Sequence, residues 1–393
     1  MVDLNNFFKK LFVVIIIIIF IIAFSPSYAS LNLDNLAFVV AMGIDTSDSK
    51  KLKVTFQFVN PPSTTEGSSQ DASIVIDSVD ANSITDAINI MNSYLAKKLD
   101  LSHCKIIVFS EEVAKNGVSE HMYTLMNDVQ IRPSSNLIIS KCSANYYIEN
   151  SNPSLETLVT KYYDIFPNSS KYTGHIPNAT VGDFFNTLVC NYCQAYAILG
   201  GITSSNPESA TISGSRLSEN IGTAIFKDDK LVGELDSTET ICFSILKNSV
   251  DNFLITIPNP EKEDSSLDLY LSPKSKPKYS VKIVNGTPFI NIDVKFSAKI
   301  YTLSENSKYL DNSSLNSISN SCNEYLKKII TEYLYKTSLT FNSDISCLGK
   351  YALSNFKTNN DFYDYNWKNN YKNSVFKVEA NTILDSGFLL NQT

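Results

Sequence analysis

An uncharged apolar tract near the N-terminus constrains this chain more than any other feature. The tract, LFVVIIIIIFIIAF (residues 11–24), follows Lys9 and Lys10 and precedes SPSYAS, which consists mostly of small residues. A charged start, an apolar centre and an exit of small residues are together typical of a secretory signal. We therefore expect everything after the tract to fold outside the cytoplasm, with the two lysines kept on the cytoplasmic side.

The export signal has two potential fates. Ser27 and Ala29 would stand at positions −3 and −1 of a cut before Ser30, where a signal peptidase requires small residues. The fourteen residues of the tract span about 21 Å as a helix, which is short of the ~30 Å hydrocarbon core. Residues 1–29 are therefore expected to be a cleaved signal peptide, with an uncut N-terminal membrane segment as the alternative.

Length and charge exclude some classes of protein. At 393 residues and with 43% hydrophobic residues, the chain is expected to form a globular body of two or three domains. The formal net charge is −7, only Arg132 and Arg216 are arginines, and the lysines are scattered. Nucleic-acid binding requires a concentrated basic face, so we expect no nucleic-acid partner.

The residue types that usually carry catalysis are few. The chain has three histidines, His103, His121 and His175, and neither a G-x-S-x-G elbow nor a glycine-rich phosphate loop. We expect His121 on the wet side of a helix and His103 in a structural, hydrogen-bonding role. The 7 cysteines are an odd number, and their only close pair, Cys190 and Cys193, lacks the second pair of a zinc site. The cysteines are therefore expected to be buried or surface thiols, and we expect no enzymatic activity, cofactor or metal.

The sequence predicts an α+β fold (mixed α/β) of three modules, each a mostly antiparallel or mixed sheet with helices packed on it. In the first module, residues 31–145, a nearly continuous apolar run at 36–45 indicates a buried strand. Apolar and polar side chains alternate over 52–58, as in a half-buried strand. An apolar stripe predicts a helix over 83–99 with Ser83 as its N-cap. Shorter patterns predict the rest of this module: strands at 74–79, 106–109 and 137–139, and helices at 111–116 and 120–128.

The second module is predicted over residues 146–260. It begins with helical pieces and proline-bearing loops, and residues 202–220 read as a flexible polar connection. Residues 221–226 and 230–233 then predict a hairpin that turns at Asp228 and Asp229, within the block Ile221–Thr240.

The third module is predicted over residues 265–393, after a boundary rich in Pro, Ser and Lys at 258–278. Residues 290–300 show the cleanest alternation in the chain, which indicates a strand with one wet face. Apolar residues at helical spacing over 315–333 predict one long amphipathic helix, and residues 375–383 a final strand. Strand, long helix and strand together favour a sheet with a helix lying on it.

Seven stretches, taken in their order along the chain, can be compared with a known family. The most specific is IGTAIFKDDKLVGELDSTET, residues 221–240. The others are LAFVVAMGID followed by KVTFQFVNP, SHCKIIVFSEEVAKNG, DVQIRPSSNLIIS, SDISCLG, Trp367 and the terminal strand ending in Ser386 and Gly387. In content and order they resemble the Ger(x)C family, the C subunits of nutrient germinant receptors in endospore-forming bacteria.

The resemblance implies a non-catalytic receptor subunit of three mixed α/β domains. It implies a place on the outer face of the spore inner membrane, at the membrane surface, with the membrane-embedded A and B subunits as partners. Family members usually carry a lipobox cysteine directly after the signal, whereas Ser25 to Leu31 stand there in this chain and the first cysteine is Cys104. We therefore expect attachment through an uncut apolar segment or through the partner subunits.

The resemblance also points to ten structurally demanding positions but to no ligand residue. Gly43 and Gly233 are expected to permit turns at strand ends, and Arg132 to bind an acid or carbonyl groups between modules. Each position is expected to serve the fold rather than a ligand. The set is Gly43, Asp45, His103, Lys105, Arg132, Gly222, Gly233, Glu239, Asp344 and Gly349.

Two functions of other classes stay open from the sequence. An extracytoplasmic solute-binding protein would have a ligand cleft between its modules. A secreted hydrolase acting on cell-wall material would need two facing carboxylates, or a histidine that touches a serine, in a deep pocket.

Overall fold

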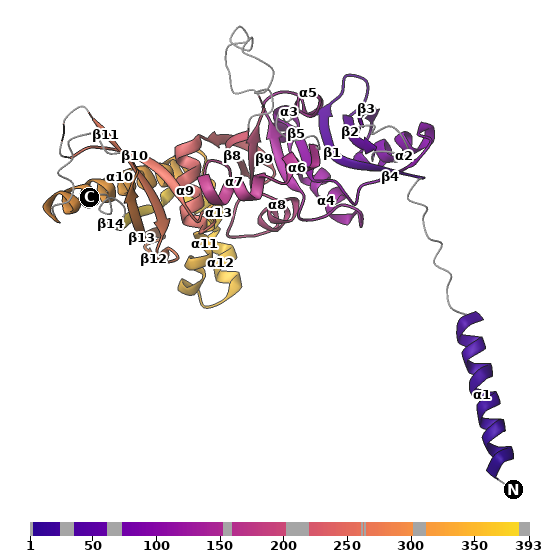
Figure 1. Ribbon diagram of the computed structural model, residues 1–393. Helices are drawn as coiled ribbons and strands as arrows, with labels where there is room; N and C mark the ends of the chain where they lie inside the picture. Colours follow the sequence, from indigo (N-terminus) through magenta and orange to yellow (C-terminus); the bar gives the residue numbers. More distant parts are fainter. Residues whose placement is uncertain are drawn as a thin grey trace, which may run out of the picture.

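The body of the protein contains two β-sheets covered by helices (Figure 1). The computed structural model describes residues 3–23, 35–60, 73–151, 159–201, 220–260, 262, 265–301 and 312–384. Helix α1 (Asp3–Ala23) carries the apolar tract and is drawn apart from the body, at the N-terminal end. Among the described residues, no helix combines the length and the apolarity needed to cross a membrane.

The first sheet has 9 strands and mixes parallel with antiparallel pairing. Its four central strands are parallel neighbours, and antiparallel pairs complete both flanks. In spatial order the strands are β3 (Ser73–Ala81), β2 (Leu52–Asn60), β1 (Leu36–Thr46), β5 (Ile106–Ser110), β6 (Asn136–Ser140), β7 (Tyr196–Gly200), β8 (Asn220–Lys227) and β9 (Lys230–Leu235), with β4 (Lys98–Asp100) paired to β1.

Helices cover both faces of the first sheet. One face packs against α2 (Ile84–Tyr94), α3 (Glu111–Asn116), α4 (Ser119–Asn127) and α8 (Val181–Leu188). The other packs against α5 (Ala144–Glu149), α6 (Val159–Tyr163), α7 (Phe166–Thr173) and α9 (Ser237–Lys247). Hydroxyl side chains begin several of these helices, because an oxygen at the N-cap accepts an otherwise unpaired backbone N–H. Ser83 does so for α2, accepting from the Asp86 N–H at 3.1 Å.

The second sheet has 5 strands, and its longest strand lies at the centre. In spatial order they are β10 (Phe253–Pro258), β11 (Ser266–Pro273), β13 (Thr287–Ile300) and β12 (Lys278–Val284), and β14 (Val375–Leu384) pairs in parallel with β13. Helix α10 (Asn312–Tyr335) packs along β14. The chain between α10 and β14 forms short helices: η3 (Lys336–Thr340), α11 (Gly349–Ala352), η4 (Leu353–Asn355), α12 (Asn359–Tyr365), α13 (Trp367–Asn370) and η5 (Tyr371–Asn373).

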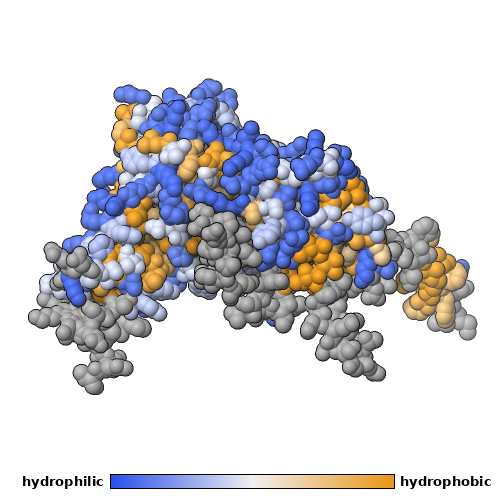
Figure 2. All heavy atoms as spheres, turned by 90° about the horizontal axis from the view of Figure 1, so that it is seen from above, coloured by the Kyte–Doolittle hydropathy of each residue, from blue (hydrophilic) through white to orange (hydrophobic). Residues whose placement is uncertain are grey.

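One hydrophobic core runs through both sheets. It starts on one face of the first sheet, at residues such as Val108 and Ile138, and continues through Phe243 of α9. It then reaches Phe296 of the second sheet and Leu326 of helix α10. A separate cluster fills the opposite face of the first sheet. From above, the body surface is mostly hydrophilic with apolar residues in separate patches, whereas α1 is apolar along most of its length (Figure 2). The two sheets are therefore joined by shared burial rather than by a linker alone.

The predicted α+β class is confirmed, and several elements lie where the sequence predicted them. The predicted helix at 111–116 is α3, the hairpin around Asp228 and Asp229 is β8 and β9, and the long amphipathic helix is α10. The strand at 290–300 is β13, whose side chains alternate between buried and exposed.

The expectation of one sheet in each of three modules is wrong for the described strands. β7, β8 and β9, all expected in the second module, extend the first sheet, and β10 belongs to the second sheet. The predicted boundary at 258–278 contains β11. These differences share one cause, since strand partners far apart in the sequence leave no trace in local periodicity. Most of the predicted polar connection, residues 202–219, lies outside the described residues.

Two local predictions in the first sheet are also corrected. The helix expected over 83–99 ends at Tyr94, and residues 98–100 pair with β1 as β4. The strand at 52–58 is not half-buried, because polar partners cover its second face. Thr55 donates to Asn145 Oδ1 at 3.1 Å, and Tyr163 donates its hydroxyl to Gln57 Oε1 at 2.8 Å.

Candidate functional site at the junction of the two sheets

The ten predicted positions fall into two groups in space. Gly43, Asp45, His103, Lys105 and Arg132 belong to the first sheet and its loops. The other five lie on β8, β9 and α9 or in the segment that follows η3, where the first sheet meets the C-terminal region. They are Gly222, Gly233, Glu239, Asp344 and Gly349.

Gly43 and Asp45 together seat helix α5 on strand β1. The Asp45 carboxylate accepts the backbone N–H groups of Ala144 at 2.7 Å and Asn145 at 2.9 Å. Burial raises the pKa of Asp45, while these two hydrogen bonds oppose the rise. A Cβ at Gly43 would lie 2.9 Å from Ile148 Cδ1, so the glycine serves close helix packing and not the predicted turn.

The three basic positions of this group lie near the surface. The ring of His103 is exposed and packs edge-on against Phe38, with ring centroids 5.1 Å apart. Lys105 pairs with Asp164 at 2.9 Å, and both side chains are more than one-third exposed. The Arg132 guanidinium is exposed and contacts no acid or carbonyl in the part of the chain that the structure describes. The predicted role of Arg132 between modules is therefore not seen.

Asp344 is the buried acid of the second group. Its side chain is 1% exposed, and its carboxylate accepts three N–H donors. These are the backbone N–H groups of Leu348 at 3.0 Å and Gly349 at 2.8 Å, and the indole N–H of Trp367 at 2.9 Å. The backbone carbonyl of Asp344 accepts the N–H of Gln194, which lies two residues before strand β7 of the first sheet. One buried acid thus connects the first sheet to the C-terminal helices.

The protonation of Asp344 reflects its burial. Burial raises the pKa of this carboxyl to about 6, although the three N–H donors and the nearby Lys247 ammonium lower it. Burial also lowers the pKa of Lys247, which the Asp344 carboxylate raises in turn. A perturbed acid often marks catalysis, but here every partner that Asp344 binds is a donor of the fold itself. We therefore interpret Asp344 as a structural acid.

Gly349 and Gly233 permit close approach by aromatic rings. A Cβ at Gly349 would overlap the Trp367 indole and approach the Tyr192 carbonyl oxygen to 2.7 Å. Gly233 lies within strand β9 and does not form the predicted turn. A Cβ there would overlap the ring of Phe341. Both positions fit glycine because a neighbouring ring occupies the space of a side chain.

Gly222 and Glu239 are explained by backbone geometry and capping. Gly222 has a φ of +98°, and a Cβ there would overlap the Leu235 carbonyl oxygen of β9. Glu239 completes a capping box with Asp236 at the start of α9. It also pairs with Lys336, whose Nζ lies 2.6 Å from Glu239 Oε2. Glu239 therefore connects α9 to the segment that follows α10.

A disulfide near Asp344 was missed by the sequence analysis. Cys193 and Cys347 are bonded, with Cα atoms 4.5 Å apart and a sequence separation of 154. The expectation that Cys193 is a plain thiol is therefore wrong. The export signal made disulfides chemically plausible, but it could not identify which two of seven cysteines meet.

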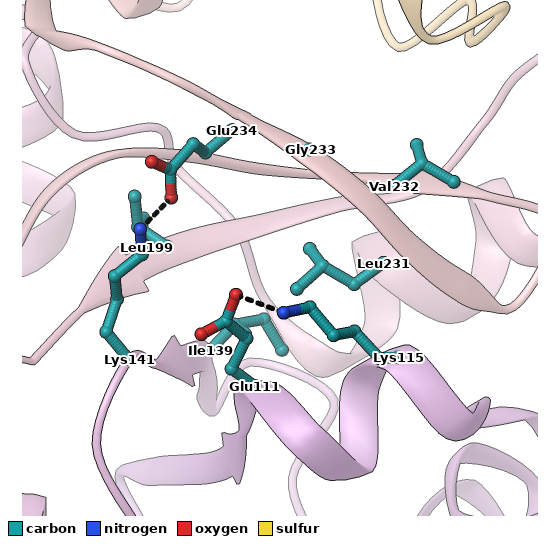
Figure 3. A pocket seen from close by; sticks show the side chains of 9 residues that line it. All are labelled: Glu111, Lys115, Ile139, Lys141, Leu199, Leu231, Val232, Gly233 and Glu234. Atoms are coloured by element: carbon teal, nitrogen blue, oxygen red, sulfur yellow. Dashed lines mark ion pairs between the residues drawn. The ribbon is translucent and has the colours of Figure 1, made fainter.

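A pocket lies beside this junction, between helix α3 and strand β9 (Figure 3). It measures about 210 Å³ and has an apolar floor that includes Ile139, Leu199 and Leu231. Two ion pairs line it: Lys115 with Glu111 at 2.8 Å and Lys141 with Glu234 at 2.5 Å (Figure 3). Because the charges neutralise one another, the pocket offers no lone charge to orient a ligand.

His121 and the clustering of metal-binding side chains were also the subject of sequence-based expectations. His121 is half-buried beside Phe109, not on a wet face as expected, and burial lowers its pKa. Within the described residues, no three His, Cys, Asp or Glu side chains gather as a metal site would require.

Comparison with known proteins gives a consistent result along most of the chain. Residues 30–199 match the family described as "Spore germination protein N-terminal domain", and residues 221–387 match "Spore germination B3/ GerAC like, C-terminal". Spore germination protein KC of Bacillus subtilis (strain 168) is 21% identical over 344 residues, which cover 84% of each protein. The crystal structure of the GerBC protein shares the fold with a TM-score of 0.51 at 18% identity, and the match covers 87% of this chain and 96% of that one.

The fold and the junction define an α+β protein whose two sheets are fastened by a buried acid, a disulfide and aromatic packing. With both of its halves matched, the chain belongs to the Ger(x)C family of spore germination proteins, as the sequence predicted.

Proposed function

We propose that this protein is the non-catalytic, extracytoplasmic C subunit of a spore nutrient germinant receptor. Membership of the spore germination family over residues 30–199 and 221–387 is the observation that carries the proposal. The subunit would assemble with membrane-embedded A and B subunits and help to trigger germination. The family match supports the process, and the assembly itself is the part to be tested.

We propose further that the body lies on the outer face of the spore inner membrane. The secretory pattern of the leader supports export, because a charged start precedes the apolar residues of α1. Without a lipobox cysteine, attachment depends on an uncut leader or on the partner subunits. The formal net charge of −7 for the whole chain gives it little attraction to anionic lipids, which favours attachment through partners.

A structural role for the described site supports a non-catalytic subunit. The carboxylate of Asp344, whose pKa is raised by burial, accepts hydrogen bonds from Leu348, Gly349 and Trp367 of its own chain. A general acid or base needs a free path to a substrate proton, and these donors occupy it. The three domains proposed from the sequence, 31–145, 146–260 and 265–393, would then act together as one organising body.

Fractionation of dormant spores tests the location and the assembly. We expect the protein in the inner-membrane fraction, and we expect affinity purification of a tagged chain to recover two polytopic membrane proteins. The N-terminal residue of the recovered chain distinguishes cleavage before Ser30 from a retained leader. Recovery of the whole chain from the cytosol, with Met1 present and no membrane partner, would overturn the proposal.

The solute-binding alternative gains no specific support from the described residues. The pocket beside α3 and β9 lies within the first sheet's layers, and its charges are already paired. Thermal melting with amino acids, sugars and nucleosides checks this alternative, since a ligand that binds the native state raises the melting temperature. We expect no shift with the isolated subunit.

A further inference from the structure

A disulfide lies where the two sheets join, and a third cysteine shortly precedes one of its members in the chain. Cys190 and Cys193 lie in the segment between α8 and β7, and Cys347 lies in the turn before α11. The disulfide joins Cys193 to Cys347, while Cys190 is a half-exposed free thiol. The close pair that the sequence singled out is therefore split: one member is bonded to a distant partner and the other is left over.

The ammonium group of Lys247 lies beside the disulfide. Lys247 Nζ lies 3.5 Å from Cys347 Sγ. Burial lowers the pKa of Lys247, and the Asp344 carboxylate is the largest influence that raises it. Cys347 thus lies beside a cation, and Cys190 lies three residues before Cys193, the bonded partner of Cys347. A cation beside Cys347 Sγ stabilises the thiolate that leaves when the Cys193–Cys347 bond breaks in thiol–disulfide exchange.

We propose that this cluster is a thiol–disulfide exchange site in which Cys190 competes with Cys347 for Cys193. The Cys190 thiolate attacks Cys193 Sγ, and the Cys193–Cys347 bond breaks as the Cys190–Cys193 bond forms. Cys347 leaves as a thiolate and takes up a proton equivalent to the one that Cys190 released. One disulfide replaces another, so the step needs no oxidant or reductant. Cys-x-x-Cys spacing is the spacing of disulfides that form and break in redox proteins.

Exchange removes a covalent tie between the two halves of the chain. Cys193 lies in the part matched by the N-terminal family and Cys347 in the part matched by the C-terminal family. Two hydrogen bonds beside the disulfide do not depend on it: Gln194 N–H to the Asp344 carbonyl, and Ser343 hydroxyl to the Phe226 carbonyl at 2.6 Å. We therefore expect exchange to loosen the junction without unfolding it. The inference stands apart from any role in germination.

Disulfide mapping of the purified full chain tests the exchange. The chain is equilibrated in a glutathione redox buffer, quenched with an alkylating reagent, digested without reduction and analysed by mass spectrometry. We expect mainly Cys193–Cys347 in the wild type. In Cys347→Ser we expect Cys190–Cys193 as the main species. In Cys190→Ser we expect Cys193–Cys347 alone, and Cys142→Ser, another half-exposed thiol, is the matched control that should behave as the wild type.

A second measurement covers the case in which Cys347→Ser does not fold. Wild-type chain is given a trace of thiol catalyst and quenched at intervals. A minor fraction of Cys347 should become alkylated, and an equal fraction of Cys190 should become protected. Cys190→Ser should abolish that alkylation of Cys347. The proposal is overturned if Cys190 remains fully alkylated at every time, or if folded Cys347→Ser leaves Cys190 and Cys193 as two free thiols.

Discussion

The two sheets bury their strands in different ways. In the first, every residue of β5 and β6 is buried, because helices cover both faces. In the second, β13 alternates between buried and exposed side chains, because α10 and the core cover only one face. The first sheet therefore behaves as an interior scaffold, and the second presents a wet surface to its surroundings. The difference also decides where a sequence pattern is informative, since alternation exists only where one face meets water.

Charged substitutions on the two sheets should give the largest effects and the sharpest contrast. Ile107→Asp and Val108→Asp point to opposite faces of β5, yet each buries an unpaired carboxylate and should cost about 4 kcal/mol or more. In β13, Ile292→Asp should destabilise the protein by a similar amount because Ile292 is buried. Asn291→Asp should be tolerated because the neighbouring Asn291 is exposed. Urea unfolding measures all four. A stable Val108→Asp protein would refute the two-sided burial of the first sheet.

Removal of the Trp367 side chain tests the junction between the sheets. Trp367 is 1% exposed, packs on Gly349 and donates to Asp344, so Trp367→Ala should lower the free energy of unfolding by about 3–5 kcal/mol. Tyr363 is a nearby aromatic residue that is 54% exposed, and Tyr363→Ala is the matched control. Equal midpoints of denaturation for the two variants would contradict the packing described here.

The pH dependence of stability should differ between wild type and Asp344→Asn. The folded-state pKa of Asp344 is raised to about 6 by burial, above its unfolded value, so its stabilising contribution is present at low pH. That contribution is lost as the pH rises from about 4 through 6, by about 3 kcal/mol for a fully buried group. Asp344→Asn does not titrate, so its unfolding free energy should fall less over this range. Parallel curves, measured by denaturant unfolding at each pH, would refute the shift.

The smallest effect is expected from an ion pair across the junction. Lys336→Met removes the partner of the half-buried Glu239 and should cost about 1 kcal/mol. The exposed pair of Lys377 and Glu379 on β14 offers a control, and Lys377→Met should leave the midpoint of urea unfolding unchanged. A larger loss from Lys377→Met than from Lys336→Met would reverse this ranking.

Local structure could be predicted from the sequence wherever one residue type decides it. Ser83 identified the start of α2, and Gly117 identified the end of α3. The alternation in β13 and the stripe in α10 also revealed the wet and buried faces of the second sheet. The family resemblance, carried by seven ordered stretches, was confirmed.

Long-range arrangement could not be predicted, because it depends on which distant residues meet. No local pattern indicated that β7 pairs with β8 across residues 201–219, or that Cys193 meets Cys347. The glycines show the same limit. Gly43 and Gly233 were recognised as demanding, but the cause lies in Ile148 and Phe341, which are remote in sequence. The domain boundaries proposed from the sequence stay predictions.

The pairing of β7 with β8 has a practical consequence for anyone who dissects this protein. Its hydrogen bonds cross the gap between the two family matches, which end at residue 199 and resume at residue 221. A fragment cut there would leave β7 with a bare edge, and bare edges recruit foreign strands and precipitate. The boundary that the sequence suggests between the two family matches is therefore a poor site for truncation. The two halves should be expressed together as a single chain.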